Sequence, residues 1–405
     1  AASDVYKRQE YQLTYLLMAV ALTLALFSFL WLQRPMSRII DYKKTETDIP
    51  PLHTPKVSVI VYSQVSEEEL MDYLHDLCGQ DYPDFEVIVV CESTAESNEM
   101  LLESCSRIFS NVYVTFIPPG SHNLSRRKLA QTLGIKAAKG EIIVTTVANA
   151  VIPSSGWLSS LVSPFRGENA DNTDVSLGYS HFDYSEMHGW GKWYREFNSV
   201  MSDSLWIGYA LKGMPYRGDG NNLAFRRKLF FDHKGYSQSI YLHSGDDDIF
   251  IHTIARPDNT KIVLTPESIL SIEWGDASKR MWSTRKEQYE FTSRWLPRKP
   301  FLRAGAMSAI QWLVTLSLAA TIAMSLWTAW QTRDLTECAP AASALVMLIL
   351  FRLVNILLYR KMAEKMCATR LWWAAPSFLL AKPILNFFFR LHHRKHRHLN
   401  FTWAR

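Results

Sequence analysis

The stretch Val57-Ser58-Val59-Ile60-Val61-Tyr62 decides the fold of this chain. It is short, apolar and rich in β-branched residues, which is typical of a buried strand. Ser66 and Glu69 follow it at the spacing of a capping box, and apolar residues then recur at helical spacing. The sequence therefore predicts a buried strand that leads into a helix.

The same strand-and-helix unit repeats along the chain. We expect it to continue in alternation, with strands at 85–90, 112–117 and 142–144, and helices at 95–108 and 125–138. This alternation implies a parallel sheet with helices on both faces. Ligands of such sheets bind at the carboxyl ends of the strands, so chemistry is expected in the loops after Tyr62, Val90 and Val144.

Long uncharged stretches flank this α/β body. Residues 11–33 and 304–332 contain no Asp, Glu, Lys or Arg. A hydrocarbon core about 30 Å thick needs about 20 helical residues to span it, so each stretch is predicted to be a transmembrane helix. A third is predicted at 341–359, which is interrupted by Arg352. The short segment 1–10 lacks an initial Met and need not be the natural start.

Basic residues beside these stretches predict the orientation. They are Arg34, Arg38, Lys43 and Lys44 after the first, and Arg294, Arg298, Lys299 and Arg303 before the second. Positive flanks mark the cytoplasmic side, so the body is expected to face the cytosol from the inner membrane of a multi-pass protein. A fourth crossing by 371–389 would place the basic tail 390–405 outside. We therefore predict an interfacial or re-entrant segment there, with the tail on lipid headgroups.

Composition excludes some classes of protein. A formal net charge of +5 over 405 residues is too weak to indicate a nucleic-acid partner. The five cysteines show no CxxC spacing, which fits reduced thiols better than a disulfide framework or a zinc site.

At this point a family resemblance enters. Five motifs, in order, resemble the family 2 glycosyltransferases: Val57–Val61, Gln80–Val90, Leu133–Val144, Gly218–Arg227 and Gly245–Phe250. The likeness covers about residues 55–296 and is similar to bacterial membrane-anchored members. It implies an α/β fold with a Rossmann-like mixed sheet, the glycosyltransferase A fold, plus transmembrane helices at both ends. It also implies a hexosyl-type transferase of polysaccharide or cell-envelope biosynthesis, with a nucleotide-sugar donor and a lipid-linked or glycan acceptor.

The resemblance completes a plan of the chain. From about residue 174 the pattern changes to short strands and aromatic-rich helices. The expected parts are an uncertain N-terminus 1–10, a transmembrane helix 11–33, a linker 34–55, a nucleotide-sugar-binding half 56–173, an acceptor-binding half 174–296, a basic juxtamembrane segment 297–303, transmembrane helices 304–332 and 341–359, the segment 371–389 and the tail 390–405.

Sugar transfer needs a general base for the acceptor hydroxyl and positive charge on the departing phosphate. Asp246-Asp247-Asp248 is the candidate base cluster. By resemblance, Asp247 aligns with the catalytic aspartate and Asp246 with its partner. Crowded like charges would raise the pKa of one carboxyl, which suits a base. The alternative is a solvated helix cap.

Donor contacts are expected from the first half. By resemblance, Glu92 contacts the nucleoside; the alternative is an ordinary loop carboxylate. Arg126, Arg127 and Lys128 precede a helix along the sheet and are candidates for holding the pyrophosphate, because arginine suits bidentate phosphate contact. The alternative is an exposed charge run.

Acceptor contacts are expected from the second half, and the resemblance adds Asp248 to them. Asn221 and Asn222 lie in a glycine-rich turn, where they either hold the acceptor or adopt left-handed turn geometry. Trp282 and Arg285 stand where the family often has Gln-x-x-Arg-Trp. The alternative there is an amphipathic helix on the membrane.

The sequence departs from the family after the fourth strand. The family usually has Asp-x-Asp there, which binds Mg²⁺ or Mn²⁺ through oxygen. This chain has Val147-Ala148-Asn149. Valine cannot bind a metal, so Asn149 is the remaining donor-site and metal-ligand candidate, and the sequence argues against a metal cofactor. Either the three basic residues at 126–128 replace the metal's charge, or the chain is a non-catalytic binding or scaffold protein.

Overall fold

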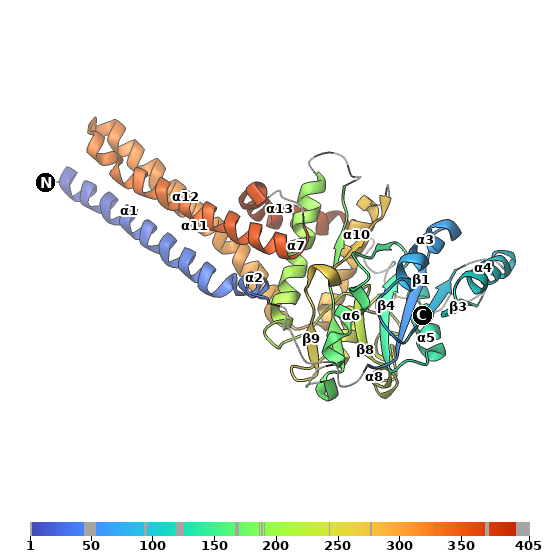
Figure 1. Ribbon diagram of the computed structural model, residues 1–405. Coiled ribbons are helices and arrows are strands. Elements are labelled where there is room, and N and C mark those ends of the chain that lie inside the picture. Colours follow the sequence, from blue (N-terminus) through green and yellow to red (C-terminus); the bar gives the residue numbers. More distant parts are fainter. Residues whose placement is uncertain are drawn as a thin grey trace. The chain divides into compact units, whose positions relative to one another are not determined.

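The computed structural model describes these parts of the chain: 2–43, 54–92, 95–118, 125–166, 170–185, 187, 189, 191–242, 244–275, 278–368 and 372–393. The chain divides into two compact units, whose elements Figure 1 labels. The helical unit is residues 1–40, 298–364 and 369–391, and the α/β unit is residues 41–297, 365–368 and 392–405. Part of the predicted linker, at 44–53, and most of the predicted tail, at 394–405, lie outside the described residues.

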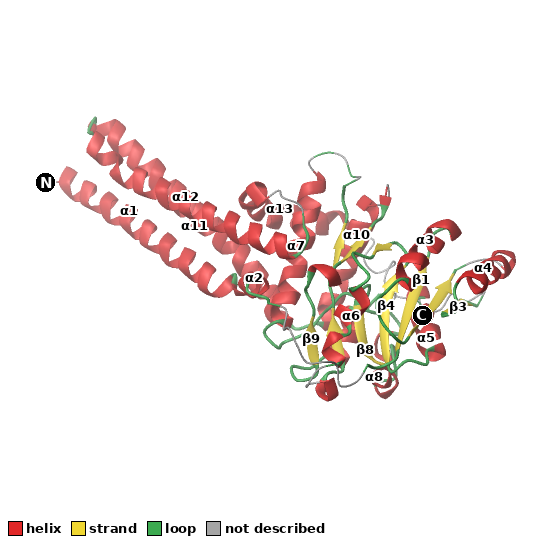
Figure 2. Ribbon diagram, in the orientation of Figure 1, coloured by secondary structure: helices red, strands yellow, loops and turns green. Residues whose placement is uncertain are grey.

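Within the described residues, the α/β unit is built on a mixed sheet of seven strands. Side by side, they are β3 (Val112–Phe116), β2 (Phe85–Cys91), β1 (Val57–Ser63), β4 (Ile142–Val147), β8 (Leu223–Arg226), β6 (Val175–Leu177) and β9 (Thr260–Ile262). The first four are parallel, while β8 is antiparallel to both of its neighbours. The predicted α/β class and mixed sheet are confirmed, and Figure 2 shows the strands in yellow.

The helices that connect the amino-terminal strands follow the predicted pattern. They are α3 (Glu67–Cys78), α4 (Ala95–Ile108) and α5 (Arg126–Ala137). Ser66 and Glu69 form the predicted capping box at the start of α3. α5 packs directly on β1, because a Cβ on its Gly134 would lie 2.5 Å from Cγ2 of Ile60. A larger residue than glycine would push this helix off the sheet.

The second half of the α/β unit adds a small sheet and further helices. The small sheet contains β5 (Ala150–Val151), β10 (Leu270–Ile272) and β7 (Ser180–Phe182). The helices are α6 (Trp157–Leu161), α7 (Gly191–Ala210), α8 (Arg227–Asp232), α9 (Asp248–Ile254) and α10 (Ser278–Thr292). The start of α9 and one side of α10 are important below because their residues line the cavity described in the next subsection.

An aromatic core supports α9. The ring of Phe250 on α9 lies 5.4 Å from that of Phe225 on β8, 5.7 Å from that of Phe230 on α8, and 5.1 Å from that of Tyr236. Edge-to-face and tilted pairs at these separations each contribute about 0.5–1.5 kcal/mol beyond burial. The packing fixes α9, and with it the aspartates at its start, against the sheet.

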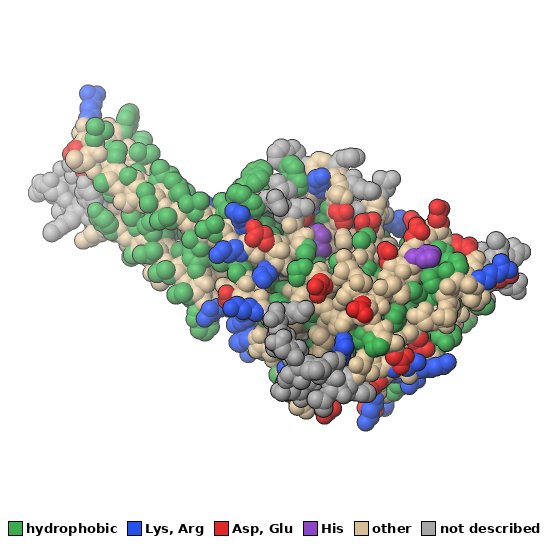
Figure 3. Space-filling model, in the orientation of Figure 1, with side chains coloured by type: hydrophobic (Ala, Val, Ile, Leu, Met, Phe, Trp, Pro, Cys, Tyr) green, Lys and Arg blue, Asp and Glu red, His purple; other side chains and the backbone are tan. Residues whose placement is uncertain are grey.

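The helical unit contains the predicted apolar segments. Its helices are α1 (Ala2–Phe27), a π-helical turn (Ser28–Leu32), α2 (Arg34–Ile40), α11 (Arg298–Thr332), α12 (Ala339–Lys365) and α13 (Ala375–His393). Among the described residues, three helical stretches are long and apolar enough to cross a membrane: 12–32, 298–332 and 335–365. Figure 3 shows hydrophobic side chains covering the visible face of these helices, as a lipid-facing surface requires.

Buried polar side chains pair with one another inside the helical unit. Asn355 of α12 accepts hydrogen bonds from Gln33 at 3.1 Å and from Gln311 of α11 at 2.9 Å. Arg352 donates to the hydroxyl of Thr315 at 2.6 Å. Polar groups within a membrane bundle are costly unless paired in this way. α13 continues without interruption through Pro383, and its expected interfacial or re-entrant position stays a prediction.

Candidate active site

A cavity of about 1050 Å³ lies in the α/β unit at the carboxyl ends of the parallel strands. Tyr62 at the end of β1 and Val147 at the end of β4 line it and are neighbours in register. Glu92, just past β2, lines it as well. β1 lies between β2 and β4, so this is the point at which the strand order reverses, where open α/β sheets bind ligands.

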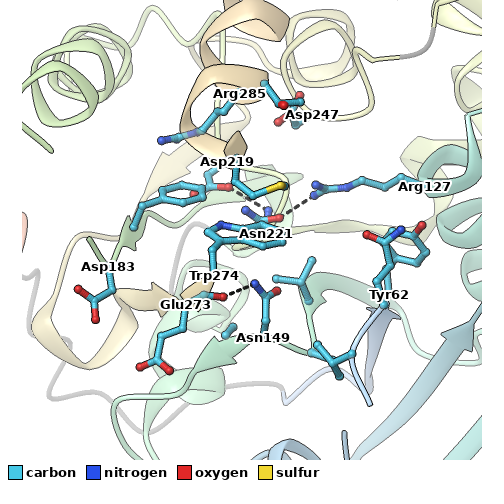
Figure 4. A pocket seen from close by; sticks show the side chains of 18 of the residues that line it. Tyr62, Arg127, Asn149, Asp183, Asp219, Asn221, Asp247, Glu273, Trp274 and Arg285 are labelled. Atoms are coloured by element: carbon cyan, nitrogen blue, oxygen red, sulfur yellow. Dashed lines mark hydrogen bonds between the residues drawn. The ribbon is translucent and has the colours of Figure 1, made fainter. Parts of the chain in front are cut away.

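The second half closes this cavity with the aspartate cluster. Asp246, Asp247 and Asp248 all line it, together with Asp219 and Asn221. Figure 4 shows Asp247, Arg127 and Asn221 around the same space as Tyr62 and Asn149. The cluster expected to meet the strand ends therefore lies in one cavity with them.

The three aspartates differ in their surroundings. Asp248 is buried and accepts hydrogen bonds from Arg217 at 2.8 Å and from the hydroxyl of Thr292. The Arg217 guanidinium also lies 3.7 Å from the ring centroid of Tyr289. Arg217 and Thr292 both approach this carboxylate from the protein interior. Because Thr292 is the last residue of α10, Asp248 links α9 to α10.

Asp246 is paired with α5 through Arg127. Its Oδ2 lies 2.7 Å from Nε of Arg127. The same guanidinium donates from Nη2 to Oδ1 of Asn221 at 2.8 Å, the dashed line in Figure 4. Arg127 thus joins α5, the glycine-rich turn at 218–222 and the aspartate cluster at one point.

Asp247 is the acidic group suited to exchange a proton. Among the described residues no cation forms an ion pair with it, and its carboxylate accepts only the N–H of Asp248, at 2.7 Å, as the N-cap of α9. Burial raises its pKa well above the ordinary value, and the charges of Asp248 and Asp246 raise it further, while Arg127 opposes them. The side chain is half-buried and borders the cavity.

Glu92 and Arg126 form a second pair at the wall of the cavity. Nε of Arg126 lies 2.6 Å from Oε2 of Glu92, and the hydroxyl of Tyr62 donates to the other oxygen. Burial and the neighbouring Glu92 raise the pKa of Tyr62, so this hydroxyl keeps its proton. The Arg126 side chain is 42% exposed and can therefore change partners at little cost.

Lys128 lies apart from its two basic neighbours. Its ammonium donates to the carbonyls of Ser239, Leu242 and Ser244 at 2.5, 2.9 and 2.8 Å. Burial lowers its pKa to about 8, against the nearby aspartate charges. All three protons are used inside the protein, so Lys128 holds the loop before the aspartate cluster and does not border the cavity.

The adjacent residues Asn221 and Asn222 lie in different surroundings. Asn221 lines the cavity, whereas Asn222 is fully buried. The amide of Asn222 donates to the carbonyls of Tyr179 and Ser268 at 2.8 and 2.7 Å and accepts from the indole of Trp157 at 3.2 Å. Asn222 therefore braces the turn that presents Asn221.

Of the two residues predicted on α10, Arg285 borders the cavity and Trp282 does not. Nη2 of Arg285 lies 3.2 Å from both oxygens of the buried Asp203, and the guanidinium lies 4.0 Å from the ring centroid of Phe182. Trp282 is buried below the guanidinium of Arg195, 5.5 Å from its ring centroid. Arg285 is a cation held in place on the α10 side of the cavity.

Sequence reasoning did not single out Asp219, Arg217 and Asp203. Both oxygens of Asp219 accept backbone N–H groups, from Ser180 at 2.9 Å and from Asn221 at 3.0 Å. Asp219 stands in the glycine-rich motif, which could have pointed to it. Asp203 is an isolated acidic residue in the middle of α7, and no sequence pattern marks it.

The end of β4 does not fit a divalent cation. Val147 borders the cavity with an apolar side chain, and the amide of Asn149 donates to the carbonyl of Glu273 at 2.7 Å, leaving one neutral oxygen. Among the described residues no group of three His, Cys, Asp or Glu side chains is arranged to hold a metal ion. Mg²⁺ and Ca²⁺ sites need several oxygen ligands, usually with carboxylates.

Comparisons with known proteins identify the fold. A protein-family model described as "Glycosyltransferase like family 2" matches residues 55–298. The chain is similar to the mannosyltransferase PcManGT from Pyrobaculum calidifontis, whose structure contains GDP-Man and Mn²⁺, at 19% identity and a TM-score of 0.50, over 94% of this chain and 99% of that chain. This likeness confirms the predicted glycosyltransferase A fold.

Two other solved structures resemble the chain less closely. S. aureus TarS 1-349 has 14% identity and a TM-score of 0.38, over 81% of this chain and 91% of that chain. Glucosyl-3-phosphoglycerate synthase from Mycobacterium tuberculosis has 17% identity and a TM-score of 0.33, over 54% of this chain and 71% of that chain. No curated protein matches the chain.

Proposed function

The chain belongs to glycosyltransferase family 2, and on that premise we propose that it moves a hexosyl group from a nucleotide-sugar donor to a lipid-linked or polysaccharide acceptor, with Asp247 as the general base. The observation that carries this proposal is the raised pKa of Asp247 in a cavity bounded by the ends of β1 and β4. A carboxylate whose pKa is raised is a stronger proton acceptor, which suits general-base catalysis.

The proposed reaction is a displacement at the anomeric carbon. The acceptor oxygen forms the new bond to this carbon, and the bond to the donor's phosphate oxygen breaks with its electron pair. The acceptor hydroxyl passes its proton to the carboxylate of Asp247. The leaving nucleoside diphosphate gains negative charge, which nearby guanidinium groups stabilise.

The other side chains divide by their position in the cavity. Glu92 is proposed to bind the nucleoside, and Arg126 and Arg127 the diphosphate, because all three border the cavity beside the strand ends. Asn221 and Arg285 border it on the opposite half and are proposed to contact the acceptor. Lys128, Asn222, Asp248 and Trp282 are proposed to hold these groups in place, since their polar atoms are occupied by the protein or they lie outside the lining.

We propose that the enzyme works at the cytoplasmic face of the inner membrane. Three apolar helical stretches support membrane anchoring, and the basic residues beside 11–33 and 304–332 support the orientation. A membrane anchor brings the α/β unit to a lipid-linked acceptor, which also favours acceptors of cell-envelope polysaccharide synthesis.

A non-catalytic binding or scaffold protein is the second candidate, favoured by Val147 and Asn149 in place of the family's acidic pair. The two are separated by turnover of the full chain in detergent micelles, with a panel of UDP- and GDP-sugars and a bacterial lipid extract as acceptor source. Release of nucleoside diphosphate that depends on the lipid extract supports the enzyme. Nucleotide binding with no release from any donor supports the second candidate.

A further inference from the structure

We propose that the donor diphosphate binds this cavity without a divalent cation, in an anion-binding corner made by Ser125, Arg126, Arg127 and Ser244. This proposal rests on the proposed function and adds that the donor binds as an anion with no metal ion attached. Its basis is the disagreement between the cation expected from the family and the residues that this chain has in the cavity.

The end of β4 offers a cation too few ligand atoms. Val147 is next to Tyr62 in register and offers no ligand atom. Asn149 is tied to Glu273 twice, because its side-chain amide donates to the Glu273 carbonyl at 2.7 Å and its own carbonyl accepts the Glu273 N–H at 3.1 Å. A cation beside Val147 and Asn149 would meet one neutral oxygen from these two side chains, and the carboxylate of the exposed Glu273 points away from Asn149 (Figure 4).

Several of the carboxylates around the cavity are not available to replace the missing ligands. Four acidic groups that border the cavity already have partners within the protein: Asp219 accepts two backbone N–H groups, Asp246 pairs with Arg127, Asp248 with Arg217, and Glu92 with Arg126. Recruiting Asp219, Asp246 or Asp248 to a cation would leave an N–H or a guanidinium inside the protein without its partner, which is costly. Asp247 remains, but one carboxylate and one neutral oxygen fall short of the several oxygen ligands that such a cation needs.

The start of α5 presents positive charge to the cavity. Arg126 and Arg127 are its first two residues and both border the cavity. The N-cap residue Ser125 makes no side-chain hydrogen bond to the helix, so no side chain competes with an anion for the first-turn N–H groups. The positive end of the helix dipole adds to the two guanidinium charges.

An independent observation at the same corner is the hydroxyl of Ser244. Ser244 is buried and borders the cavity, and its Oγ has no hydrogen-bond partner among the described residues. Its carbonyl accepts from Lys128, in the first turn of α5, at 2.8 Å, which places it beside the helix start. A buried hydroxyl without a hydrogen-bond partner is explained if it donates to an oxygen of a bound ligand.

Two guanidinium groups then supply positive charge to the diphosphate in place of a metal. The diphosphate of a sugar nucleotide is a dianion, and Arg126 and Arg127 both border the cavity. Nε of Arg126 lies 2.6 Å from Glu92, and Nε of Arg127 lies 2.7 Å from Asp246. Each guanidinium has five N–H donors, so phosphate oxygens are expected to bind at the N–H groups that these carboxylates do not use.

The test measures binding of UDP and GDP to the full chain in detergent micelles by calorimetry, in EDTA and again in Mn²⁺. We expect one of the nucleotides to bind in EDTA with an affinity within about threefold of that in Mn²⁺. Arg126→Met and Ser244→Ala are expected to weaken this binding about tenfold or more, as loss of a charge-assisted bond does. Arg107→Met, an exposed arginine on α4, is the matched control and should bind as wild type does.

A gain-of-function variant gives a second readout. Val147→Asp with Asn149→Asp restores the acidic pair, and should create a Mn²⁺ site visible as loss of the free Mn²⁺ resonance signal, whereas the wild type leaves that signal unchanged. Nucleotide binding only in Mn²⁺, or stoichiometric Mn²⁺ binding by the wild type, would overturn the inference and leave the proposed function intact. No binding of either nucleotide under both conditions would overturn both.

Discussion

Gly220→Ala probes the position of the proposed base without changing any polar group. A Cβ on Gly220 would lie 2.7 Å from Cβ of Asp247 and 3.5 Å from its Cα. The Gly220 carbonyl accepts the hydroxyl of Thr145 on β4 at 2.8 Å, so the turn is fixed on one side. Asp247 is fixed on the other side as the N-cap of α9. The added methyl group would also lie 3.2 Å from Nη2 of Arg127, but its closest contact is with Asp247, which is held by the backbone of α9.

The size of the effect follows from these distances. Moving the two carbons from 2.7 Å to an ordinary contact of 3.4 Å requires a shift of about 0.7 Å. Overpacking of this kind costs about 1–3 kcal/mol of stability. Misplacement of a catalytic group by about 1 Å can cost about 100-fold in rate, so we expect kcat to fall about 10- to 100-fold.

The assay compares release of nucleoside diphosphate, nucleotide affinity and melting temperature for Gly220→Ala, wild type and Gly156→Ala. Gly156 precedes α6, and the nearest atom to its Cβ position is 3.6 Å away, so this control should behave as wild type does. We expect kcat to fall more than nucleotide affinity in Gly220→Ala, because the added Cβ meets Asp247 at 2.7 Å and Nη2 of Arg127 only at 3.2 Å. A folded Gly220→Ala protein with wild-type kcat would refute the placement of Asp247 against this turn.

Three other predictions test the supporting structure. Burial lowers the pKa of Lys128 from 10.5 to about 8, so unfolding takes up a proton between these two pH values. The melting temperature of the wild type should therefore rise with pH in this range relative to that of Lys128→Met. Parallel curves of melting temperature against pH would contradict this. Thr292→Val removes a hydrogen bond to Asp248 and should lower stability by about 1–3 kcal/mol without changing nucleotide affinity, as measured by thermal unfolding and calorimetry. Asn355→Leu leaves two buried glutamine amides without their acceptor and should destabilise the helical unit by about 1 kcal/mol in detergent titrations; an unchanged midpoint would argue against the pairing.

The strands and the family could be predicted because they depend on local pattern. β1, β2 and β4 are short runs rich in apolar, β-branched residues, and their side chains are almost entirely buried. The capping box at Ser66 is likewise a local signal and is present. The two uncharged stretches and the segment that contains Arg352 correspond to the three helical segments that are long and apolar enough for a membrane among the described residues.

The roles of neighbouring site residues could not be separated from sequence. Arg126, Arg127 and Lys128 are consecutive on a helix, so their side chains point about 100° apart, and only the tertiary structure determines that Lys128 turns inward. The adjacent Asn221 and Asn222 diverge for the same reason in a tight turn. Asp203 was not found because its function depends on Arg285, 82 positions away in the chain.

The central claim is that Asp247 takes the proton of the acceptor hydroxyl. Its most direct test is the rate of nucleoside diphosphate release by Asp247→Asn, measured beside wild type and the exposed Asp232→Asn on α8 with the same donor and lipid extract. The account predicts a fall of about 10²- to 10⁴-fold in Asp247→Asn with nucleotide affinity retained, and no change in Asp232→Asn. Turnover by Asp247→Asn within threefold of wild type would contradict it.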